Sequence, residues 1–178
     1  MSSVIASAAQ AAHSVATSLL AKAQIQPGAT IPPSDLKEDA PDQAKPLVLT
    51  GKNVIIGVPG AFTTPCNGHI PPYIERFEDF KAKGVNEIYV VAVNDAFVTK
   101  AWKEKLAPKG TPIHFIADDK AAFVSSLGLL FDASGLLGGP RSKRFTIVTD
   151  GDKVVSVAVE DAPPNVTVTG AEAVLATL

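Results

Sequence analysis

Cysteine is almost absent from this sequence, because its 178 residues include one, Cys66. A single cysteine excludes an internal disulfide and a zinc site built on paired cysteines. Three scattered histidines form no ligand pattern either, so we expect no metal and no cofactor. A chain without disulfides suits a reducing compartment, and we expect a cytoplasmic location. A mitochondrial location is a minor alternative, since the first residues are serine-rich and lack acids but also lack arginine.

The sequence has no surplus of one charge and no long hydrophobic run. Lys and Arg number 16 and Asp and Glu 18, for a net charge of -2. This balance gives no electrostatic reason to expect nucleic acid or an anionic membrane as partner. No run is long and apolar enough to cross a membrane as a helix. The content of 46% hydrophobic and 19% charged residues indicates one globular domain.

The N-terminal part differs in composition from the rest. Apolar residues recur at helical spacing from Val4 to Leu20, which predicts a helical extension over residues 1–24 that docks on the domain or on a partner subunit. Residues 25–46 are rich in proline and acids. We expect them to form an extended, solvated connection within a domain spanning 25–178, and not a packed element.

Beyond residue 46, short apolar runs alternate with amphipathic stretches. Strands are predicted at 54–58, 87–93 and 113–117, each followed by a helical pattern. Two further strands, 145–149 and 153–159, flank the hairpin signal Asp150-Gly151-Asp152, and a helix at 171–178 closes the chain. This order predicts an α/β protein with a thioredoxin-like fold, in which a mixed central sheet carries helices on both faces.

Cys66 lies where the first of these strands gives way to a helix. Pro59 and Gly60 end the strand, and apolar residues at three- and four-residue steps follow Cys66. Free amides and the dipole at a helix start favour a thiolate, the reactive form of cysteine. Thr63 stands three residues earlier and has a hydroxyl to direct at the sulfur or at an oxygen bound beside it. The pattern therefore predicts a reachable, nucleophilic thiol.

A thiolate also needs a nearby positive charge, which the local sequence does not supply. The basic residues of the following helix are expected to face solvent. A better source of positive charge is the cluster of Arg141, Lys143 and Arg144, which directly precedes a predicted core strand. The end of a core strand is rigid, so it holds an arginine in a fixed direction. Spacing alone does not decide between Arg141 and Arg144.

Four sequence blocks, in order, resemble the peroxiredoxins, and most closely the peroxiredoxin-five branch with its plant type-II and fungal alkyl hydroperoxide reductase-like members. The blocks are 57–73, 83–85, 93–102 and 141–145, and the resemblance extends over residues 45–178. It implies a thioredoxin-like fold and the reduction of hydrogen peroxide and alkyl hydroperoxides without a cofactor, in antioxidant defence and redox homeostasis. By analogy with this branch, we also expect a homodimer.

The resemblance also implies roles for individual residues. Cys66 would be the peroxidatic cysteine, whose thiolate attacks the peroxide and becomes a sulfenic acid. Thr63 would hydrogen-bond the thiolate and the peroxide. Arg144 would stabilise the thiolate and polarise the O–O bond, with Arg141 as a weaker candidate. Pro59 would shield the sulfenic acid from water.

The sequence departs from the family pattern close to the cysteine. Pro65 directly precedes Cys66, where relatives commonly carry threonine, and the spacing from Cys66 to His69 is one residue shorter than usual. No resolving cysteine is present, since Val90 occupies one of its usual places and 160–178 contain none. An external thiol must therefore recycle the sulfenic acid, and glutathione, glutaredoxin and thioredoxin are the expected partners.

Several alternatives stay open at this point. The same thiolate serves a non-catalytic redox sensor or relay that forms a mixed disulfide with a client protein. His69 is either a base near the site or a helix-surface or capping residue. No site role is expected for the remaining candidates: Trp102 is a core or interface residue, Lys143 is solvated, Asp118-Asp119 caps a helix, and His13 and His114 are structural.

Overall fold

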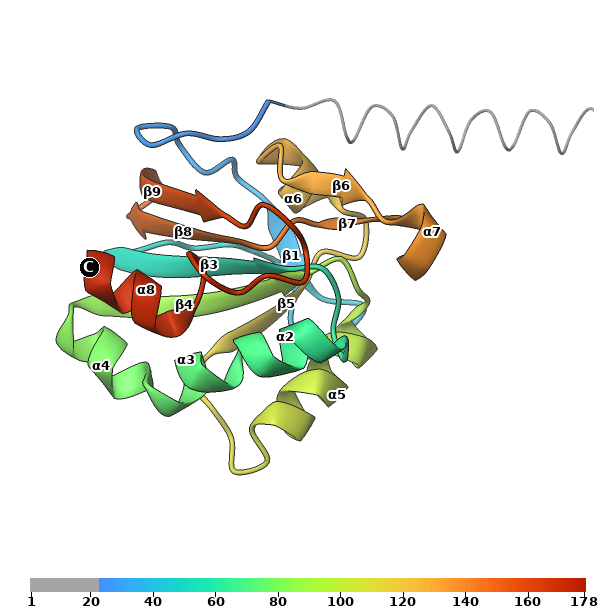
Figure 1. Cartoon of the computed structure of the whole chain (residues 1–178), viewed down its shortest axis with the longest axis horizontal. Helices are drawn as coiled ribbons and strands as arrows, with labels where there is room; N and C mark the ends of the chain where they lie inside the picture. Colours follow the sequence, from blue (N-terminus) through green and yellow to red (C-terminus); the bar gives the residue numbers. More distant parts are fainter. Residues whose placement is uncertain (1–22) are drawn as a thin grey trace, which may run out of the picture.

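A mixed seven-stranded sheet forms the centre of the computed structural model, which describes residues 23–178 (Figure 1). The predicted N-terminal helix falls largely outside these residues. The strand order is β2-β1-β5-β4-β3-β8-β9. The bounds are β1 Asp35–Lys37, β2 Ala44–Pro46, β3 Lys52–Val58, β4 Val85–Ala92, β5 His114–Ala117, β8 Phe145–Asp150 and β9 Lys153–Val159. Strands β3, β4 and β5 are parallel, whereas β8 runs antiparallel to both β3 and β9.

Helices cover both faces of this sheet, as predicted (Figure 1). One face carries α2 Thr64–His69, α3 Pro71–Glu75, α4 Phe77–Ala82, α5 Ala96–Leu106 and α8 Ala171–Thr177. The other carries α6 Ala122–Ser126 and a small sheet of β6 Leu130–Asp132 and β7 Pro140–Ser142, with α7 Ser134–Leu137 between these two strands. The mixed sheet of a thioredoxin-like fold is thereby confirmed. No helix among residues 23–178 is long and apolar enough to span a membrane.

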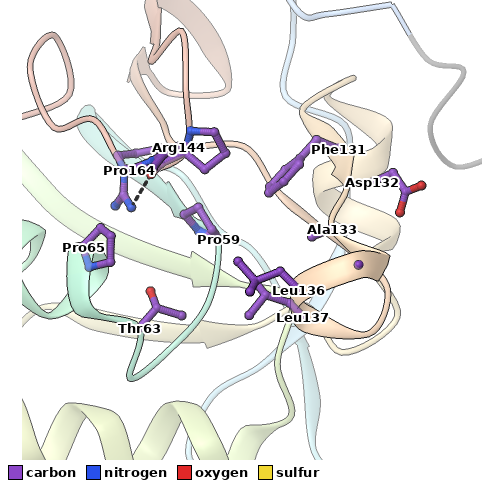
Figure 2. A pocket seen from close by; sticks show the side chains of 12 residues that line it. Pro59, Thr63, Pro65, Phe131, Asp132, Ala133, Leu136, Leu137, Arg144 and Pro164 are labelled. Carbon is purple, nitrogen blue, oxygen red and sulfur yellow. Dashed lines mark hydrogen bonds between the residues drawn. The ribbon is translucent and has the colours of Figure 1, made fainter.

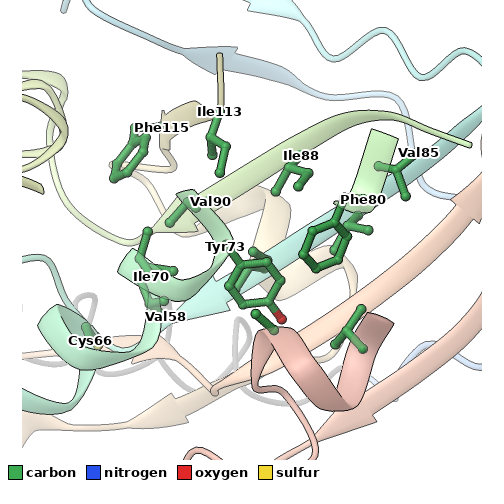
Figure 3. Close-up of a cluster of buried hydrophobic side chains, with 14 of the residues drawn as sticks. Val58, Cys66, Ile70, Tyr73, Phe80, Val85, Ile88, Val90, Ile113 and Phe115 are labelled. Carbon is green, nitrogen blue, oxygen red and sulfur yellow. The ribbon is translucent and has the colours of Figure 1, made fainter. Parts of the chain in front are cut away.

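The central strand β3 is buried on both sides because nearly every residue in it is apolar. Val54, Ile56 and Val58 point into the core under α2 to α5, while Ile55 points into the core under α6. Figure 3 shows the first of these cores, where side chains from the segment after Cys66 pack against the sheet. The prolines at 71 and 72 lie at the break between α2 and α3, because their missing N–H groups and fixed φ interrupt a continuous helix.

The prediction of an unpacked connection over residues 25–46 is wrong. Strand β1 pairs with both β2 and β5, and Leu36 and Ile31 are only 7% and 4% exposed. Apolar residues between the prolines and acids supply enough buried surface for this segment to join the sheet. Two ion pairs link the segment to the rest of the domain: Glu38 pairs with His114, and Lys37 pairs with Asp119. Strands β6 and β7 and helix α7 were also not predicted.

Gly57 allows β3 and β8 to approach closely beside the cysteine loop. It lies opposite Phe145 in the β3–β8 register. A Cβ atom at Gly57 would meet the fully buried Phe145 ring at 2.0 Å. The ring therefore occupies the space of the missing side chain, and it fixes the start of β8, where Arg144 immediately precedes Phe145.

We predict that Gly57→Ala destabilises the fold by about 1–3 kcal/mol, since a packed ring must move to admit the methyl group. Urea unfolding measures this change. Gly68→Ala in α2 is the matched control. Nothing lies within 4 Å of a Cβ atom added there, so the methyl group should stabilise the fold by no more than about 1 kcal/mol. Equal stabilities for the two variants would contradict the assigned contact.

Candidate active site

Cys66 lies in the first turn of α2, directly after the strand-to-helix loop, as the sequence predicts. Thr63 is the N-cap residue, and Pro65 occupies the first turn, where a missing N–H costs nothing. The Cys66 side chain is 0% exposed and packs beside Ile70 in the core (Figure 3). The expectation of a reachable thiol is therefore not met in this conformation, because the loop and α2 cover the sulfur.

The loop before α2 is held in an unusual backbone conformation. Phe62 has φ of 65°, which is costly for an aromatic residue. Asn67 compensates, since its side-chain amide donates to the Phe62 carbonyl at 3.1 Å. The indole N–H of Trp102 donates to the same Asn67 side chain at 2.7 Å. Trp102 is thus a buried core residue that also anchors the cysteine loop from α5.

The Thr63 hydroxyl does not donate a hydrogen bond to the sulfur. Its Oγ1 donates to the Gly60 carbonyl at 3.0 Å, within the same turn. A hydroxyl has one proton and two lone pairs, so in this arrangement Thr63 is an acceptor towards the neighbouring pocket. An O–H group that enters the pocket is therefore able to donate a hydrogen bond to the Thr63 hydroxyl oxygen.

Arg144 is the cation that the fold brings to Cys66. It precedes β8 and is 1% exposed, and its Nη2 lies 3.4 Å from Sγ of Cys66. Its other bonds go to neutral acceptors, with Nη1 at 2.9 Å from Nδ1 of His69 and both Nε and Nη2 donating to the Pro163 carbonyl at 3.0 and 2.8 Å. Arg141 instead donates to the carbonyls of Val93 and Leu137. The structure thereby separates two arginines that spacing alone did not.

His69 is neither a surface nor a capping residue, because its ring is buried between Arg144 and the segment before α8. Its Nδ1 accepts from Arg144, so Nε2 carries the proton and donates to the Thr169 carbonyl at 2.7 Å. Burial is the main reason that the pKa of His69 falls to about 4, and the Arg144 charge lowers it further against the opposing effect of the Thr169 carbonyl. His69 is therefore neutral at pH 7.

Glu160 organises the loop between β9 and α8, and no sequence signal pointed to it. Its carboxylate accepts from both the backbone N–H and the hydroxyl of Thr167 and of Thr169, at 2.6–2.9 Å. Burial opposes its ionisation, but these hydrogen bonds outweigh burial and lower the pKa of Glu160 to about 2. The same loop supplies the Pro163 carbonyl to Arg144 and the Thr169 carbonyl to His69.

An apolar pocket of about 490 Å³ opens over this site (Figure 2). Pro59, Thr63, Pro65 and Arg144 form its inner end. Its outer wall is largely apolar and comes from β6, α7 and the loop after β9, with Phe131, Ala133, Leu136, Leu137, Pro163 and Pro164. The Arg141 bond to Leu137 ties α7 in place as part of this wall.

Two other residues considered from the sequence, His114 and Asp118, lie outside this cluster, and His13 lies outside the described residues. His114 stacks on Tyr89 and contacts Glu38 and Glu87. Asp118 caps α6, because its carboxylate accepts from the N–H groups of Phe123 and Val124. Among residues 23–178, no group of three or more His, Cys, Asp or Glu side chains is arranged to hold a metal ion.

Comparisons with known proteins show the family to which the chain belongs. A family model described as Redoxin matches residues 26–175. "Peroxisomal membrane associated protein 20" of Schizosaccharomyces pombe is 45% identical over 152 residues, which are 85% of this chain and 97% of that protein. "Peroxiredoxin-2B" of Arabidopsis thaliana is 37% identical over 161 residues, 89% of this chain and 98% of that protein.

A solved structure shares the fold at similar identity. Reduced Prx3 from Vibrio vulnificus, in complex with H2O2, is 40% identical, matches 87% of this chain and 100% of its own, and has a TM-score of 0.79. The chain therefore belongs to the redoxin family and is a peroxiredoxin, a thiol-dependent peroxidase with a single cysteine.

Proposed function

We propose that this peroxiredoxin reduces hydrogen peroxide and alkyl hydroperoxides at Cys66 and is recycled by an external thiol. The observation that carries the proposal is the 3.4 Å contact between Nη2 of Arg144 and Sγ of Cys66. No Asp or Glu of the described residues forms an ion pair with Arg144. A buried guanidinium without a carboxylate favours the ionised form of the one acid beside it, the thiol.

In the proposed reaction the Cys66 thiolate attacks the terminal oxygen of the hydroperoxide. An S–O bond forms as the O–O bond breaks, and the leaving oxygen takes a proton to become water or an alcohol. Arg144 stabilises the negative charge that passes from sulfur to the leaving oxygen. The lone pairs of Thr63 accept the hydroperoxide O–H, which orients the terminal oxygen towards the sulfur. Pro59, buried at the inner end of the pocket, keeps water from the sulfenic acid.

Recycling uses two molecules of thiol. The first displaces water from the sulfenic acid and forms a mixed disulfide, and the second releases the Cys66 thiolate and leaves the two thiols joined as a disulfide. Since Cys66 is the only cysteine of the chain, both must come from outside. The buried sulfur must also become exposed, and α2 is a separate six-residue helix that ends before Pro71.

We further propose a homodimer in the cytoplasm. Support for the dimer comes from Leu136 and Phe62, which expose apolar side chains at the pocket wall and beside Thr63, at 87% and 42%. The cytoplasmic proposal rests on the single cysteine. Sedimentation velocity and imaging of a tagged chain check these two points.

The test of the overall function is steady-state peroxide consumption with glutathione, glutaredoxin or thioredoxin as the thiol donor. We expect catalytic turnover with at least one donor and none with Cys66→Ser, because the serine hydroxyl is a far weaker nucleophile than a thiolate. Stoichiometric oxidation of the native chain without turnover under any donor would instead support a redox sensor.

Arg144→Gln should slow oxidation of Cys66 by about 100-fold or more, since it removes a charged donor from the developing negative charge. Stopped-flow mixing of the reduced protein with hydrogen peroxide measures this rate. Arg141→Gln is the matched control, because that guanidinium bonds backbone carbonyls of Val93 and Leu137 and not the sulfur. Equal rates for the two variants would remove Arg144 from the mechanism.

Leu137→Ser should lower kcat/KM for cumene hydroperoxide by about 3- to 10-fold, as expected when part of a leucine's apolar contact is lost. The value for hydrogen peroxide should stay the same, because that substrate has no apolar part to bind. Val155→Ser, an exposed substitution on β9, serves as the control. A parallel loss for both peroxides would show that α7 supports the site as a whole and does not bind the substrate's alkyl group.

A further inference from the structure

Apart from the sulfur of Cys66, every acceptor that holds the Arg144 guanidinium is neutral. The Pro163 carbonyl takes two of its N–H groups, and Nδ1 of His69 takes a third. None of these acceptors cancels the positive charge, so the charge stays available to Cys66. The direction of the guanidinium therefore depends on how firmly these two acceptors are held.

Both acceptors depend on the loop that Glu160 closes. Pro163 belongs to that loop, and the His69 ring is fixed at its far nitrogen by the Thr169 carbonyl. The Tyr73 hydroxyl donates to the same carbonyl at 2.5 Å, and burial raises the pKa of Tyr73, so it stays a donor. The Glu160 carboxylate joins the loop end to end through Thr167 and Thr169. Its backbone N–H also donates to the Arg144 carbonyl at 3.0 Å.

We propose that Glu160 is a positioning residue of the peroxidase site, which aims Arg144 at Cys66 by closing the 160–169 loop. This inference rests on the proposed function, since it takes Cys66 and Arg144 as the reacting groups. Glu160 touches neither the sulfur nor the substrate pocket. It acts through Pro163 on one side of the guanidinium and through Thr169 and His69 on the other.

Glutamine at position 160 separates geometry from charge. Its carbonyl oxygen is able to accept the three bonds now made to Oε1, and its NH2 is able to donate to the Thr167 hydroxyl, which has lone pairs to accept it. Glu160→Gln thus keeps the loop closed but removes the negative charge. Glu160→Ala removes both.

We expect Glu160→Ala to slow the oxidation of Cys66 by about 10- to 100-fold, as small displacements of a catalytic group do, and Glu160→Gln to stay within about 3-fold of the native rate. Stopped-flow oxidation by hydrogen peroxide gives the rates. The pH dependence of Cys66 alkylation by iodoacetamide should move to higher pH in the alanine variant only. A native rate and pH profile for a folded Glu160→Ala protein would overturn the proposal, and equal losses in both variants would replace positioning by an effect of charge.

A double-mutant cycle separates failure of this inference from failure of the proposed function. In a chain that already carries Arg144→Gln, Glu160→Ala should cause no further loss of rate, because the group it aims is gone. A full additional loss in that background would overturn the positioning role. Native kinetics for Arg144→Gln alone would instead overturn the role of Arg144 in the proposed function.

Thr167→Val keeps the test decisive if Glu160→Ala does not fold. It removes only the hydroxyl bond to Oε2 of Glu160, at an exposed residue. We expect an intermediate loss of about 5- to 10-fold, because a single loop bond is lost while the backbone bonds remain. A native rate for Thr167→Val together with a slowed Glu160→Gln would count against positioning and in favour of charge.

Discussion

A buried guanidinium held by neutral acceptors beside the only thiol is the interaction on which the site depends. An isolated charge in a protein interior is costly unless it is paired and hydrogen-bonded. The Pro163 carbonyl and the His69 ring take three N–H groups of Arg144 but leave its charge unbalanced. The sulfur lies 3.4 Å from Nη2, and no Asp or Glu of the described residues forms an ion pair with Arg144. In the proposed reaction, the positive charge that the fold buries beside the sulfur is the one that faces the leaving oxygen.

The fold places Arg144 beside Cys66 by bringing three distant chain segments together at one end of the sheet. Strand β3 leads into the cysteine loop, β8 begins beside it, and the loop after β9 crosses both (Figure 1). Gly57 lets the Phe145 ring lie flat against β3, which sets the position of the adjacent Arg144. Asn67 and Trp102 hold the cysteine loop from the opposite side. Cys66 and Arg144 thus come from separate elements, and each of these elements packs into the core.

The shortened spacing between Cys66 and His69 has a structural consequence. Residues three apart share one face of a helix, so the sulfur and the imidazole both face Arg144 from α2. The proline at position 65 fits the first helical turn, where it needs no hydrogen-bond acceptor. These departures from the family pattern are therefore compatible with the site and place a neutral ring against the guanidinium. The sulfur is fully buried, so the proposed reaction requires that it become accessible from the neighbouring pocket.

Local patterns in the sequence were enough to predict the alternating strands and helices, the hairpin at Gly151, and the place of Cys66 at a strand-to-helix junction. These features depend on periodicity and turn chemistry within short windows. The packing of Leu36 and the roles of Glu160 and His69 were not predictable in this way. They depend on contacts between residues far apart in the chain, such as the 75 residues that separate His69 from Arg144. The sequence by itself determined that one thiol is present, that it lies at a strand-to-helix junction, and which fold carries it. The family resemblance favoured Arg144 over Arg141. Only the tertiary structure decided what holds Arg144 beside the sulfur, because side-chain direction is set by packing across the sheet.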